Sequence, residues 1–191
     1  MKRLIVVALM LCIFYSSKAQ VTVPEPEFIG QVVVLTSDST GVLLNKEKPS
    51  LKAKSNGVAY IPIPGASLLS KTKTSIVLNG TSSNTKVASD TVRFIIKLEN
   101  REVDPTSTVH VMKFDVKKKT REAVVADFGL LNGFNYATEQ SETYTVTKYG
   151  ESSVLFTLNS VSEGEYGICN VPIISAIAFS EMSTFGVDPE E

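Results

Sequence analysis

One stretch of the chain holds most of the side chains that could act on a ligand. Residues 108–129, TVHVMKFDVKKKTREAVVADFG, contain the only histidine of the 191 residues, His110. The same stretch carries the densest run of cations, Lys117, Lys118, Lys119 and Arg121. A histidine suits acid–base catalysis, and clustered cations suit an anion or an anionic polysaccharide. The choice between these uses depends on the elements that carry the residues.

Polarity alternates over residues 109–116, which predicts a strand with His110 on the same face as Met112, Phe114 and Val116. This is the core face. A general base needs an accessible cleft and an orienting partner, and Asp115 lies on the opposite face. We therefore interpret His110 as a core or rim residue. The four cations fall where the strand reverses, so we interpret them as the solvated tip of a hairpin, with contact to an anion or glycan as the alternative.

The remaining reactive residues form no recognisable site. Zinc usually takes three or four cysteine or histidine ligands, and Cys169 and His110 are the only such residues after position 19. Cys169 lies among strand-like residues and is interpreted as a small buried hydrophobe. We expect no cofactor, no metal and no enzyme activity. The alternative is a glycan hydrolase that pairs two of the loop and strand-end acids, Glu25, Glu27, Asp38, Asp104 and Asp127.

The first nineteen residues have the features of a signal peptide. Lys2 and Arg3 precede an apolar run over residues 4–15, and Ser17 and Ala19 place small residues where signal peptidase reads them. The apolar run is shorter than the roughly 20 residues of a membrane-spanning helix. We expect cleavage after Ala19 and export to the periplasm, the cell surface or the extracellular space. We expect no membrane span in the mature chain.

Cleavage changes the charge of the chain. It removes three of the 19 basic residues and none of the 20 acidic ones, which leaves 16 against 20 and a net charge of −4. An acidic chain has no general attraction to nucleic acid. A single remaining cysteine excludes an intramolecular disulfide, so the stability of the exported protein must come from its core.

From residue 28 onward the sequence is typical of short strands separated by turns. FIGQVVVL, residues 28–35, is a continuous apolar run, and Val92, Phe94, Ile96 and Leu98 fall on one face of a strand with Arg93 and Lys97 on the other. Further strands are expected at residues 42–46, 57–63, 74–79, 109–116, 122–128, 143–148, 152–159, 165–171 and 173–179. This pattern predicts an all-β fold, an antiparallel β-sandwich with Greek-key or jelly-roll-like connections. Tyr166 is expected either to form a tyrosine corner, bonding nearby backbone, or to lie simply at the rim of the core.

The predicted domain covers residues 28–187. It follows an extended leader, residues 20–27, and precedes an acidic tail, residues 188–191. Pro24 and Pro26 cannot extend a strand ladder, so the leader is expected to be mobile and to contribute little to stability.

Four segments carry a resemblance to known sequences. TVRFIIKLEN, DPTSTVHVMKFDVKKKTREA, KYGESSVLFTL and EGEYGI occur in this order, and over about residues 50–187 the chain resembles an uncharacterised family of exported bacterial β-proteins. The resemblance implies export and a β-rich fold. That family has no established activity, so no site residues follow from it. We interpret the protein as a non-enzymatic binding, adhesion or assembly module of the cell envelope, with an envelope protein or a glycan as its partner.

Export makes a prediction about mass. The protein recovered from its native host should begin at Gln20, so intact mass spectrometry should show a chain that lacks residues 1–19. Recovery of a chain that still contains them would contradict the assignment of a signal peptide.

Overall fold

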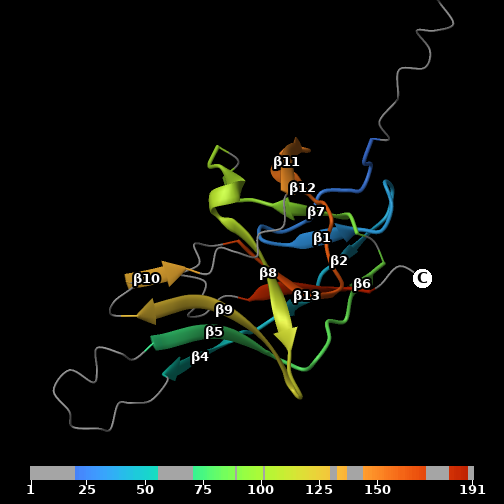
Figure 1. Cartoon of the computed structure of the whole chain (residues 1–191). Coiled ribbons are helices and arrows are strands. Elements are labelled where there is room, and N and C mark those ends of the chain that lie inside the picture. Colours follow the sequence, from blue (N-terminus) through green and yellow to red (C-terminus); the bar gives the residue numbers. More distant parts are fainter. Residues whose placement is uncertain are drawn as a thin grey trace, which may run out of the picture.

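The computed structural model describes residues 20–55, 71–88, 90–100, 102–129, 133–136, 144–170 and 181–188. Two β-sheets form most of this part of the chain (Figure 1). The five-stranded sheet contains, in spatial order, β11 (Tyr144–Tyr149), β12 (Ser153–Leu158), β7 (Val92–Lys97), β1 (Val32–Leu35) and β2 (Gly41–Leu43). Within the described residues, no helix has the length and apolar character needed to cross a membrane.

The nine-stranded sheet contains, in spatial order, β3 (Lys46–Glu47), β14 (Met182–Val187), β13 (Gly164–Asn170), β8 (Val109–Val116), β9 (Thr120–Gly129), β5 (Lys71–Asn79) and β4 (Ser50–Ser55). In addition, β10 (Gly133–Tyr136) pairs with β9, and β6 (Lys86–Val87) pairs with β14. The pairing of β6 with β14 is parallel, and the other described pairings are antiparallel. The predicted all-β sandwich is confirmed, but this larger sheet also curls into a half-barrel.

The curl begins at the β8–β9 hairpin. Residues Val109–Phe114 of β8 pair with β13, and only Asp115 and Val116 pair with β9. Beyond these two pairs β9 leaves β8 and pairs along its length with β5. The hairpin predicted from the sequence is therefore correct at its tip and wrong further in, because each strand continues along a different neighbour.

Most strands lie where their alternation predicts them. β8 matches its predicted range, and β1 pairs with β2 across residues 36–40. The run 28–35 becomes a strand only at Val32, because Phe28–Gln31 form a turn in which Gly30 has a φ of +76°. The expected strands 57–63 and 173–179 and the signal peptide lie outside the described residues.

Two hydrophobic cores explain why β14, one of the strands that were not predicted, escaped notice in the sequence. The core between the sheets includes Phe94 and Phe156, whose rings stack with centroids 4.9 Å apart. The second core lies inside the curl and includes Ile76, Phe114 and Met182. β8, β13 and β14 contribute side chains to both cores. All six residues of β14 are buried, so the strand has no alternation between apolar and polar residues to reveal it.

The tyrosine corner is confirmed. The Tyr166 hydroxyl donates a hydrogen bond to the Ser162 carbonyl at 2.7 Å, and the ring stacks on Phe185 at 5.3 Å between centroids. Tyr166 is fully buried in the core between the sheets. This bond anchors the connection into β13.

The N-terminal segment, residues 20–27, is packed rather than mobile, so that part of the expectation was wrong. Its prolines do keep it out of a ladder, but Val23 is buried against Leu35 and Ile95 on the outer face of the five-stranded sheet. The Tyr149 hydroxyl donates to the Val23 carbonyl. The Glu25 carboxylate accepts hydrogen bonds from the backbone amides of the β11–β12 turn. At the other end, Asp188, the first residue of the predicted acidic tail, lies 3.6 Å from Lys86.

The carboxylate of Glu25 should make stability depend on pH. Burial opposes its ionisation, but the Ser153 side chain and the amides of Glu151 (2.6 Å) and Ser152 (3.0 Å) together outweigh burial and lower its pKa from 4.5 to about 2. Because the folded pKa is the lower one, the stabilisation is complete above pH 4.5 and is lost as the pH falls toward 2.

We therefore expect Glu25→Gln to lower the melting temperature at pH 7, by an amount that shrinks as the pH is lowered through this window. Glu27→Gln is the matched control, since Glu27 is exposed on the same segment. Thermal melts over the pH range measure the effect. Equal melting temperatures for Glu25→Gln and the wild type at pH 7 would contradict the role given to this residue.

Candidate functional site

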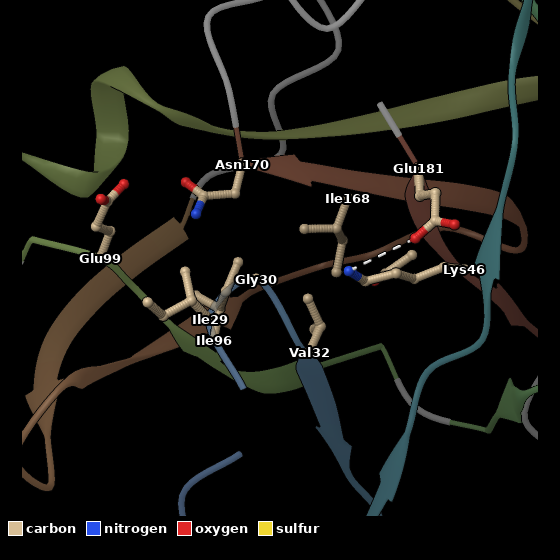
Figure 2. A pocket seen from close by; sticks show the side chains of 10 residues that line it. Ile29, Gly30, Val32, Lys46, Ile96, Glu99, Ile168, Asn170 and Glu181 are labelled. Carbon is tan, nitrogen blue, oxygen red and sulfur yellow. Dashed lines mark ion pairs between the residues drawn. The ribbon is translucent and has the colours of Figure 1, made fainter. Parts of the chain in front are cut away.

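A pocket of about 260 Å³ opens between the two sheets, where β1 and β7 face β3, β13 and β14 (Figure 2). Its floor is aliphatic and consists of Val32, Ile96 and Ile168, which also belong to the core between the sheets. The pocket is therefore an open end of that core, and we call it the sheet-end pocket.

The mouth of the pocket is shaped by the turn before β1. The Gly30 amide donates to the Lys97 carbonyl at 2.8 Å, which fixes the turn against the end of β7. Gly30 has the positive φ that this turn requires, a conformation that other residues rarely adopt. The preceding residue, Ile29, consequently lies at the mouth with 57% of its surface exposed.

The polar residues of the pocket come from strand ends. Figure 2 shows Glu99 at one end of the pocket, near Asn170, and the Lys46–Glu181 ion pair at the other. The Lys46 ammonium lies 3.8 Å from the Glu181 carboxylate, and both side chains are solvent-exposed. An exposed pair of this kind contributes little to stability, so a ligand can rearrange it at low cost. The lining carries two carboxylates against one ammonium, a net charge of −1.

The size of the pocket limits what it can hold. A dry cavity of about 150 Å³ accommodates a benzene molecule, and pockets for drug-sized ligands begin at about 300 Å³. At about 260 Å³ the sheet-end pocket has room for one bulky apolar side chain or ring. The negative balance of the lining favours a group with a cation beside it.

The predicted basic tip lies elsewhere, and one of its four members was wrongly assigned. Lys117, Lys118 and Lys119 are exposed in the turn between β8 and β9, as expected. Arg121 is buried, with 1% of its surface exposed. Strand alternation explains the difference, because Arg121 shares the inner face of β9 with Ala123 and Val125 and so points into the curl.

Inside the curl, Arg121 is fully bonded. Its Nη2 atom donates to Glu47 at 2.6 Å, and its Nη1 atom donates to the Ser83 hydroxyl at 2.7 Å and lies 3.5 Å from Glu165. It also donates to the carbonyls of Asn79 and Gly80. This arrangement is a structural ion cluster, and its guanidinium is not available to an external ligand.

Glu165 is the most buried carboxylate of the cluster. Burial opposes its ionisation, but hydrogen bonds from Lys86 and from the hydroxyl and amide of Ser83 lower its pKa. Glu47 in turn accepts a bond from the Thr184 hydroxyl at 2.6 Å. Glu165 is therefore held as an anion, which does not suit it to donate a proton as a general acid.

His110 and Cys169 lie directly opposite each other in the pairing of β8 with β13. Burial lowers the pKa of His110 and raises that of the Cys169 thiol to about 11. The thiolate is the nucleophilic form of cysteine, and it is scarcely populated at neutral pH with such a pKa. The half-buried position of His110, on one face with the buried Phe114, agrees with its interpretation as a core or rim residue.

The acids suggested for a catalytic pair are used structurally or stand alone. Asp38 bonds Arg93 at 2.6 Å, and Asp104 accepts the Thr106 amide at 2.9 Å at the start of a short 3₁₀ turn, Pro105–Ser107. Glu25 accepts hydrogen bonds from the β11–β12 turn, and Glu27 is exposed. The side chain of Asp127 is not among those that the structure describes. In the described part of the chain, no three of the His, Cys, Asp and Glu residues are grouped so as to hold a metal ion.

The sequence offered no local signal for the sheet-end pocket. Lys46, Glu99 and Glu181 look like ordinary solvent-exposed charges at strand ends, and only the meeting of the two sheets brings them to one pocket. Comparison with known proteins adds no family: no family model matches the chain, and no curated protein matches it.

The ion cluster yields a stability prediction. Arg121→Leu leaves Glu47 and Glu165 without their shared cation, and removing one partner of a buried ion pair costs about 3–5 kcal/mol. The free energy of unfolding, measured with urea, should fall by that amount. Lys118→Ser, an exposed change in the turn between β8 and β9, should change it by no more than about 0.5 kcal/mol. Similar values for the two variants would show that the cluster does not stabilise the curl.

Proposed function

We propose that this protein is an exported, non-enzymatic binding module of the cell envelope, in which the sheet-end pocket holds one bulky apolar side chain of a partner protein. The observation that carries this proposal is the pocket itself, an aliphatic floor continuous with the core and a polar, net-negative lining. Protein interfaces concentrate their binding energy in such pockets, where an apolar anchor is buried and polar groups surround it.

The surface beside the pocket supports a protein partner. Phe28 and Ile29, in the turn at the mouth, are two of the most exposed large hydrophobic residues of the described chain. Exposed apolar side chains next to a pocket extend the surface that a partner can cover. The negative lining favours a lysine or arginine next to the anchor on the partner side.

The pocket can be tested with defined peptides. The probe is a capped tripeptide with phenylalanine between two lysines, and its analogue with alanine in the centre is the ligand control. We expect the phenylalanine peptide to cause saturable NMR shifts at the amides of Gly30, Lys46 and Asn170, and the alanine peptide to cause none.

Variants then separate the pocket from other apolar surface. Ile29→Asp should abolish the shifts, whereas Leu43→Asp, at an exposed apolar position on the edge strand β2, should leave them intact. Loss of the shifts in both variants, or shifts that do not saturate, would count against the pocket as the binding site.

A glycan hydrolase remains the second candidate, because two carboxylates, Glu99 and Glu181, line this pocket from opposite ends (Figure 2). Hydrolysis of a glycosidic bond needs one acid and one base or nucleophile on either side of the bond. Release of reducing sugar from a glycan, lost in both Glu99→Gln and Glu181→Gln but kept in Glu102→Gln, would favour this candidate over the binding module.

A further inference from the structure

Lysines line one face of β4 and β5. The two strands read SLKAKS and KTKTSIVLN, so Lys52, Lys54, Lys71 and Lys73 alternate with other residues. Alternate residues of a strand share a face, and the register places Lys52 opposite Ser75 and Lys54 opposite Lys73. Ile76, one position further along β5, is buried inside the curl. The lysine positions are therefore on the outer, convex face of the half-barrel.

Two carboxylates on this face need neighbouring cations. Asp115 and Glu122 lie directly opposite each other in the β8–β9 pair, an arrangement that is destabilising for like charges. Lys52 donates to Glu122 at 2.9 Å, and Lys117 lies 3.6 Å from Asp115. The hydrogen bond from Lys52 and the charges of Lys52 and Lys117 lower the pKa of Glu122.

These side chains surround a hollow of about 220 Å³ together with Lys73 and Ser75. The Lys73 ammonium makes no ion pair with any carboxylate that the structure describes. Lys52 and Lys117 balance Glu122 and Asp115, so Lys73 is the cation of the hollow that has no ion pair among the described side chains.

The charge of the whole face is strongly positive. With the tip of the β8–β9 hairpin, its described side chains include five lysines, at positions 52, 73, 117, 118 and 119, against two acids, Asp115 and Glu122. The backbone register adds the positions of Lys54, Lys71 and Asp127, the last opposite Lys73. The complete chain has a net charge of −1. The cations are therefore concentrated on this face, and acids predominate elsewhere.

We propose that this lysine face binds an acidic polysaccharide, with one carboxylate or sulfate group of the polymer seated beside Lys73. Same-face residues lie about 6.6–6.8 Å apart along a strand and strands about 4.8 Å apart, so the lysine positions are closely spaced on this face. A polymer with an anion on successive sugars can engage several of them at once, which multiplies weak contacts. The described lining of the hollow contains no aromatic ring on which a nucleic-acid base could stack.

The test measures binding of the purified mature protein to dextran sulfate, polygalacturonate and neutral dextran at low and high salt. Binding to at least one of the two anionic polymers, weakened by salt, with none to neutral dextran, is the expected result. Binding to only one of them identifies a sulfate or a carboxylate as the preferred anion.

Single-charge variants locate the site. Lys73→Gln should weaken binding about fivefold, the effect of one basic residue next to an anionic surface, and Lys73→Arg should retain it. Lys148→Gln, at an exposed position on β11 of the other sheet, is the matched control and should bind as the wild type does. Ile29→Asp should also bind normally, so this inference and the sheet-end pocket succeed or fail separately.

Three results would overturn the proposal. The first is no binding of the wild type to either anionic polymer at low salt. The second is an equal loss in Lys73→Gln and Lys148→Gln, which would indicate only general charge attraction. The third is tighter binding, through Lys73, to duplex DNA or to vesicles containing anionic lipid, which would identify a different class of partner.

Discussion

The guanidinium of Arg121 closes the larger sheet on itself. Arg121 belongs to β9, yet it bonds Glu47 of β3, and β14, β13 and β8 lie between these two strands in the sheet. A charge with 1% of its surface exposed must be paired, because an unpaired buried ion costs several kcal/mol. The pairing with Glu47 and Glu165 can form only if the sheet bends until its strands face across the curl. The curl, the second core and the convex face all depend on this contact.

The curl decides which surfaces can take a ligand. β8, β13 and β14 are covered on both faces, by the core between the sheets on one side and by the core of the curl on the other. Binding surfaces are consequently found at the periphery. One is the open end of the sandwich, where aliphatic residues meet charged strand ends, and the other is the convex face, where the lysines of β4 and β5 have no layer of described residues above them.

The two surfaces differ in chemistry. The sheet-end pocket is small, apolar at its floor and net negative, whereas the convex face is net positive. A protein side chain suits the first and an acidic polymer suits the second. A module that holds a protein at one surface and a glycan at the other would link two components of a cell envelope, which is consistent with the assembly role proposed for it.

The sequence by itself determined the features that are local along the chain. Period-two alternation located β7, β8 and β12, the all-β class followed from it, and Tyr166 bonds a carbonyl only four residues away. Tertiary structure alone decided the rest. Arg121 follows three lysines and resembles them in sequence. Its position in β9 nevertheless places its side chain on the inner face of the strand, in a buried ion cluster, whereas the lysines are exposed to solvent. Glu47 and Glu165, and the strand ends around the sheet-end pocket, meet only after distant strands have packed. Residues so far apart carry no shared periodicity, so their partnership is set by which strands become neighbours and not by any pattern within a strand.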